Sequence, residues 1–78
     1  MNSLEGGSVY NVIEVVGTSI NGWEEAIRNV ADTTSKVLTN LRIMQVVELD
    51  VTLSEGMIME YRARVKLSFK HETEPETL

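Results

Sequence analysis

The chain has 78 residues, of which 42% are apolar and 24% charged, values typical of one small globular domain and not of a disordered segment. It contains no cysteine, which excludes disulfides, thiolate catalysis and cysteine-ligated metal centres and favours a cytoplasmic location. The net charge of −5 argues against a nucleic-acid partner, and no apolar run reaches the roughly 18 residues of a membrane helix, so we expect no membrane partner either.

The size of the domain has a consequence for its stability. A chain of this length buries only about 60% of its unfolded surface, so we expect either a very good core or burial of apolar surface between copies. We predict a flexible N-terminus at residues 1–8, one domain at 9–70 and an acidic flexible tail at 71–78, which holds three Glu. The segment MNSLEGGS has no basic region before an apolar core, so no secretory signal is predicted.

The first half of the domain predicts a strand and then a helix. Val9–Val16 is rich in β-branched residues, which is typical of a strand. After a turn-rich stretch, apolar residues recur at helical spacing between Trp23 and Leu38, which predicts an amphipathic helix. We expect Trp23, on the apolar stripe of this helix, to fill the core.

The second half predicts two strands. Apolar residues occupy every odd position from Met57 to Phe69, so Met57 and Met59 are expected to face the core. The alternation in Leu41–Leu53 changes phase near Val46–Val47, which indicates a β-bulge. The bulge would place on one face Met44, Val46, Val47, Leu49 and Val51, and on the other Ile43, Gln45, Glu48 and Asp50.

The turn between these strands sets their register. A two-residue loop would bring odd positions opposite even ones, so the apolar residues of the two strands would point to opposite sides of the sheet. A three-residue loop at Ser54–Gly56 is therefore predicted. In that register Glu48 lies opposite Arg62, which is favourable. Asp50 lies opposite Glu60, which is unfavourable because the charges are alike.

These elements predict an α+β fold in the order β-α-β-β, with a three-stranded antiparallel sheet packed on one helix. The connection through the helix makes the first two strands parallel, and the third can lie between them. A single helix covers one face of such a sheet and leaves the other bare.

The order and spacing of several short segments resemble the dodecin family over Val9 to Lys70. These segments are VYNVIEVVGTS, WEEA, NLR, VVE and, in the last strand, YR and SF. Dodecins are small β-α-β-β proteins that assemble into hollow dodecamers, and most of them bind riboflavin, FMN or FAD. The resemblance implies a homododecamer that stores or sequesters a small-molecule ligand and has no enzymatic activity.

Two positions depart from the flavin-binding pattern. In flavin-binding dodecins an aromatic residue near the start of the second strand stacks on the flavin, and the matching position is Ile43. A glutamine usually follows the tyrosine of the third strand, and the matching position is Arg62. The resemblance therefore implies weakened flavin binding and a likeness to the flavin-free branch that has been linked to calcium.

The candidate ligand site consists of residues expected on the bare face, namely Ile43, Gln45, Glu48, Arg62 and Arg64. One interpretation is an altered small-molecule pocket at a contact between subunits. The other is that Ile43 packs against its own copy while Arg62 pairs with Glu48.

Asp50 and Glu60 are the candidate metal ligands, because like charges that face one another need neutralisation. A calcium ion could supply it with help from another subunit, since calcium takes about 6–8 oxygens. A neighbouring Lys or Arg, or solvent, is the alternative. No catalytic triad or phosphate loop can be assembled, so a purely structural shell stays open beside the flavin and calcium hypotheses.

Overall fold

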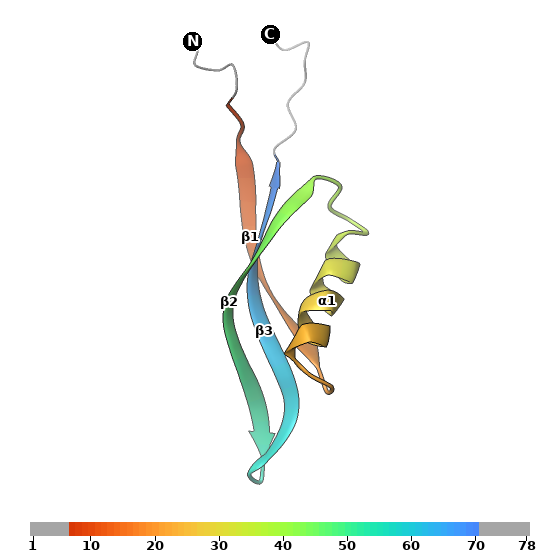
Figure 1. Ribbon diagram of the computed structural model, residues 1–78, viewed down its shortest axis with the longest axis vertical. Coiled ribbons are helices and arrows are strands. Elements are labelled where there is room, and N and C mark those ends of the chain that lie inside the picture. The colour runs from red at the N-terminus through yellow and green to blue at the C-terminus, as the bar shows by residue number, and fades with distance from the viewer. Residues whose placement is uncertain (1–6, 71–78) are drawn as a thin grey trace.

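The computed structural model describes residues 7–70, in the order β1-α1-β2-β3 (Figure 1). The strands are β1 (Tyr10–Ser19), β2 (Leu41–Ser54) and β3 (Met57–Lys70), and the helix α1 spans Trp23–Thr34. The predicted α+β fold of one helix and three strands is confirmed. Flexible ends are predicted for residues 1–8 and 71–78, and of these residues 1–6 and 71–78 lie outside the described residues.

The three strands form one sheet in the order β1-β3-β2, with β3 antiparallel to both neighbours. The two outer strands are therefore parallel to each other, as predicted. The helix packs over β1 and β3 on one side of the sheet. No helix within residues 7–70 is long and apolar enough to cross a membrane.

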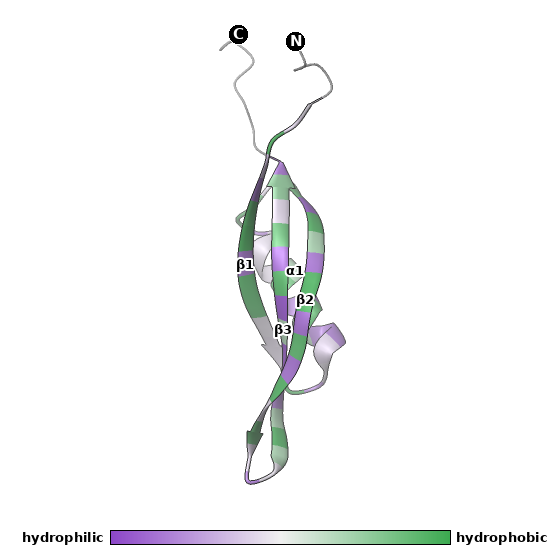
Figure 2. Ribbon diagram, turned by 90° about the vertical axis from the view of Figure 1, so that its left-hand side faces the viewer, coloured by the Kyte–Doolittle hydropathy of each residue, from purple (hydrophilic) through white to green (hydrophobic). Residues whose placement is uncertain are grey.

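The core lies between α1 and the central strand. Ala26 and Val30 of the helix pack on Ala63, Val65 and Leu67 of β3, and all five are buried. Apolar and polar residues alternate along this part of β3 (Figure 2). Successive side chains of a strand point to opposite sides of the sheet, which explains the period-2 pattern.

A glycine in β1 lets the helix approach the sheet closely. A Cβ added at Gly17 would overlap the Val30 side chain and the Ala26 carbonyl oxygen. Only hydrogen fits in this space, so the helix rests directly on the β1 backbone.

The helix is shorter than its apolar pattern predicts, because it ends at Thr34 and not near Leu38. The Thr34 hydroxyl donates to the Val30 carbonyl (2.7 Å) and the Ser35 hydroxyl to the Asp32 carbonyl (3.2 Å). Such side-chain bonds compete with the helical main chain. The last part of the predicted stripe therefore lies in the connection to β2.

Trp23 does not fill the core, contrary to prediction. Its side chain is 38% exposed at the start of α1, where the ring stands edge-on to Tyr61 with centroids 5.1 Å apart. The indole Nε1 donates to the main-chain carbonyl of Asp50, at 2.9 Å. The first residue of the helix is tied to β2 by this bond, across the central strand.

The predicted three-residue loop at Ser54–Gly56 is wrong, because a two-residue turn joins β2 to β3 and Ser54 pairs with Met57. Glu55 and Gly56 have φ angles of 53° and 79°, as this kind of tight hairpin turn requires. The register then shifts by one residue at Met59, between the pairs Leu53–Ile58 and Thr52–Glu60. This bulge brings odd positions back into line with odd ones.

The observed register changes the partners of the charged residues. Asp50 lies opposite Arg62 and Glu48 opposite Arg64, so the predicted pairs Asp50–Glu60 and Glu48–Arg62 are both wrong. Glu60 lies opposite Thr52 instead. The like-charge contact that motivated the metal prediction is therefore absent.

The predicted bulge near Val46–Val47 is confirmed, because the register shifts between Val46 and Glu48. Val46 pairs with Val65 on the helix side, whereas Glu48 pairs with Arg64 on the opposite side. The predicted division of β2 into two faces follows from this register.

Candidate functional site

The candidate site lies on the face of the sheet that α1 does not cover, which we call the open face. The register places residues of all three strands there, and the central part of this face is made up of four from each. They are Val12, Glu14, Val16 and Thr18 of β1, Ile43, Gln45, Glu48 and Asp50 of β2, and Arg62, Arg64, Lys66 and Ser68 of β3. All five predicted ligand-site residues are among them.

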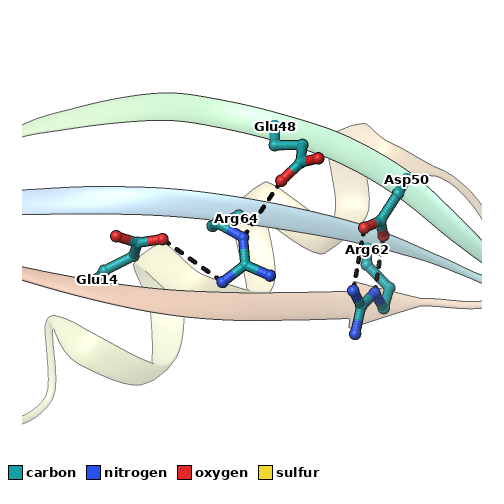
Figure 3. A network of polar contacts seen from close by, with 5 residues as sticks. All are labelled: Glu14, Glu48, Asp50, Arg62 and Arg64. Atoms are coloured by element: carbon teal, nitrogen blue, oxygen red, sulfur yellow. Dashed lines mark hydrogen bonds and ion pairs between the residues drawn. The ribbon is translucent and has the colours of Figure 1, made fainter.

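Asp50 and Arg62 form the closest ion pair on the open face (Figure 3). Arg62 donates from Nε to Asp50 Oδ1 at 2.7 Å and from Nη2 to Oδ2 at 3.0 Å, and both side chains are partly buried. The hydrogen bond from Arg62 lowers the pKa of the Asp50 carboxyl below its ordinary value. The same hydrogen bond raises the pKa of Arg62.

Arg64 lies between carboxylates from both outer strands. Its Nη1 is 3.4 Å from Glu14 Oε2 in β1, and its Nε is 3.4 Å from Glu48 Oε1 in β2 (Figure 3). The basic side chains of the central strand are thus flanked by acids. The alternative in which Arg62 pairs with Glu48 is wrong, because Asp50 takes that place.

Ile43 and Arg62 share the open face but do not meet within one chain. Ile43 lies opposite Ser68, six residues along β3 from Arg62, which corresponds to about 20 Å at the rise of a strand. The Ile43 side chain is 52% exposed. A small ligand that touches both residues must therefore contact two copies of the chain.

The described residues do not form a metal site by themselves. No group of three or more His, Cys, Asp or Glu that could hold a metal occurs within residues 7–70. Both carboxylate oxygens of Asp50 accept hydrogen bonds from Arg62. A metal role for Asp50 and Glu60 stays a prediction that would need ligands from another copy.

The hairpin between β2 and β3 extends beyond the helix (Figure 1), and its apolar residues are exposed. We call Leu53, Met57, Ile58 and Met59 the hairpin arm. Met57 is 69% exposed and Met59 54%, so the prediction that they face the core is wrong. Apolar residues continue to the tip of the hairpin, but the helix does not.

A separate cavity of about 200 Å³ lies near the other end of the sheet. Its walls come from the α1–β2 connection and from the ends of β1 and β3. It includes none of the predicted site residues, so it gives no support to the predicted ligand site.

The comparisons with known proteins agree with the fold. The sequence model of the Dodecin family matches residues 9–72. The Dodecin of Thermus thermophilus is 35% identical over 66 residues, which cover 85% of this chain and 96% of the relative. The Calcium dodecin of Mycobacterium tuberculosis is 32% identical over 63 residues, which cover 81% and 89%.

Solved structures give the same result. The structure of dodecin from Streptomyces coelicolor superposes with a TM-score of 0.82 at 30% identity. The match covers 88% of this chain and 99% of that one. The likeness therefore extends over the helix and all three strands.

Proposed function

The chain belongs to the dodecin family, and from this premise we propose that it assembles with copies of itself into a hollow homododecamer that binds and stores a small ligand. In this proposal the protein has no catalytic role. The ligand binds against the open face, at contacts between copies.

One observation carries the proposal, namely that the open face is covered by nothing within the described chain. Ile43, Val12 and Val16 are exposed there beside the ion pairs of the central strand. Apolar surface of this kind is stabilised when a partner removes it from water. The 20 Å between Ile43 and Arg62 supports a ligand site to which two copies contribute.

Sedimentation velocity at micromolar concentration tests the assembly. The expected result is a single species with the mass of a dodecamer. A folded lone chain under these conditions would overturn the shell and the ligand site together.

Flavin binding is expected to be weak, because Ile43 cannot stack on a flavin ring and Asp50 holds Arg62. Aromatic stacking contributes about 1–3 kcal/mol per ring in comparable nucleobase sites. The double variant Ile43→Trp with Arg62→Gln should therefore gain tenfold or more in flavin affinity, measured by quenching of flavin fluorescence. Ile43→Leu with Arg62→Gln is the matched control, and an equal gain in the control would contradict the stacking argument.

Calcium is the second candidate ligand, and the likeness to a relative named Calcium dodecin favours it. Calcium needs more oxygens than one chain offers at Asp50 and Glu60, so the ion would bind where several copies bring carboxylates together. Isothermal calorimetry of the assembled protein tests this, with Asp50→Asn and Glu60→Gln as variants. No heat from the unmodified protein would dispose of calcium and leave a shell with a structural role.

A further inference from the structure

The two ends of the open face differ in how their charges are matched. Toward the hairpin, both arginines of β3 are bound by carboxylates of the outer strands. Toward the opposite end, the exposed Lys66 takes part in none of the ion pairs formed within residues 7–70. Glu14 lies directly opposite Lys66 in the register, but its carboxylate points to Arg64 at 3.4 Å (Figure 3). Lys66 is therefore a positive charge without a carboxylate partner in the described chain.

The nearest residues of Lys66 toward β2 and along β3 are uncharged. Gln45 lies opposite Lys66 on β2, and Ser68 is the next residue of β3 on the same face. Ser68 in turn lies between Ile43 on β2 and Val12 on β1, whose side chains are 52% and 56% exposed. An uncovered apolar strip thus adjoins the ammonium group.

The register gives this patch the dimensions of a small aromatic ring system. Adjacent strands lie about 5 Å apart, so Val12 and Ile43 are about 10 Å from each other across β3. Diagonal neighbours such as Ile43 and Lys66 lie about 7–8 Å apart, within reach of a long side chain. A single chain therefore brings Lys66 close to Ile43, whereas Arg62 is about 20 Å away.

We propose that Ile43, Gln45 and Lys66 of one copy form a binding site for an aromatic anion, and that Lys66 selects for its negative charge. The ring lies over the apolar strip, and its carboxylate or phosphate accepts a hydrogen bond from the Lys66 ammonium. The side-chain amide of Gln45 can donate to the same group. This inference rests on the small-ligand storage proposed above and names the chemical class of the ligand.

Charge complementarity favours an anion over a neutral or cationic ligand of the same shape. An anion at Lys66 gains an attraction without breaking an existing ion pair, and Lys70, further along the same face, adds to the positive potential. At Arg62 the same anion would have to displace Asp50, which accepts two hydrogen bonds from the guanidinium. Because Lys66 is exposed to solvent, its contribution is modest and decreases with salt.

Isothermal calorimetry with naphthalene probes tests the selection for charge. Naphthoate and naphthyl phosphate carry the ring with a negative charge, and naphthamide, substituted at the same ring position, carries it without one. The assembled protein should bind the anions about threefold or more tighter than the amide at low salt, and the difference should shrink at high salt. Either anion as the tighter of the two supports the proposal and identifies the preferred acidic group.

Substitutions assign the selection to one side chain. Lys66→Gln should remove most of the preference for the anions, whereas Lys66→Arg should keep it. Lys36→Gln makes the same change of net charge in the α1–β2 connection, away from the sheet face, and is the matched control. Ile43→Ala should weaken the binding of all the probes by a similar factor, because the ring loses an apolar contact.

Equal affinity for the anions and the amide, absence of binding by either anion, or a preference unchanged in Lys66→Gln would overturn this inference. Sedimentation velocity of the same samples separates that result from a failure of the proposed function. A dodecamer without the preference leaves the proposed shell intact. A folded lone chain would instead overturn the shell itself.

Discussion

The part of the sheet under α1 and the hairpin arm contrast within a single strand. Val65 and Leu67 of β3 are fully buried by the helix, whereas Met57 and Ile58 of the same strand are more than half exposed. Apolar and polar residues alternate in the first part, whereas Met57, Ile58 and Met59 of the second are consecutive apolar residues. The comparison shows that an apolar pattern indicates which residues can be buried, while burial itself depends on whether another element reaches them.

Substitution of two leucines tests this contrast most directly. Leu67→Ala removes a fully buried side chain and should lower the free energy of unfolding by about 2–5 kcal/mol. Leu53→Ala, on the arm, should instead raise the concentration needed for assembly if a second copy covers this exposed side chain in the proposed shell. Urea denaturation at fixed chain concentration and sedimentation velocity measure the two effects. Equal losses of stability in both variants, without loss of assembly for Leu53→Ala, would contradict the difference between the buried and the exposed part of the sheet.

The close approach of the helix is tested at Gly17. The variant Gly17→Ala places a methyl group against Val30 and the Ala26 carbonyl, and this overpacking should cost about 1–3 kcal/mol of stability. The control is Val16→Ala, its neighbour on the open face, which does not touch the helix. A Gly17→Ala protein with unchanged thermal stability would show that the helix can retreat from β1 at no cost.

A substitution in the turn at the tip of the arm should raise the stability of the protein, in contrast to Gly17→Ala. Glu55 holds a left-handed backbone conformation that asparagine adopts more readily. Glu55→Asn should therefore stabilise the hairpin by about 0.5–1 kcal/mol, seen as a higher melting temperature. Gly56→Ala, at φ of 79°, is the matched control and should destabilise it. A stabilising Gly56→Ala would contradict the two-residue turn.

The smallest effect on stability is expected from protonation of Asp50 on the open face at low pH. The hydrogen bond from Arg62 lowers the pKa of Asp50 in the folded chain, so the unfolded chain takes up this proton first as the pH falls. The contribution of Asp50 to stability is complete above about pH 4, the ordinary range of an aspartate, and is lost as the pH falls through the lowered value. Asp50→Asn should lose less stability than the unmodified chain between pH 5 and about pH 2. Superimposable acid denaturation profiles would contradict this.

The sequence predicts which side of the sheet a residue faces better than it predicts which residue lies opposite on the neighbouring strand. A three-residue loop and a two-residue turn followed by a bulge at Met59 both keep odd residues opposite odd ones. The two arrangements differ by two residues in register, so hydrophobic alternation cannot distinguish them. For that reason the division of β2 at Val47 is predicted correctly, while the partner of Asp50 is not.

Other residues of the site depend on tertiary context that the pattern does not contain. The apolar stripe predicts that Trp23 fills the core, and it gives no sign that the indole instead reaches a carbonyl of β2. The choice of Glu14 and Glu48 for Arg64 follows only from the register.

The bond between Trp23 and Asp50 also gives the molecule an optical label. Trp23 is the one tryptophan in the sequence, so all indole emission comes from a ring attached to the strand residue whose carboxylate holds Arg62. Anything that shifts β2 on the open face alters the surroundings of that ring on the other side. Ligand binding to the open face, as proposed, should thus be measurable by intrinsic fluorescence without a dye.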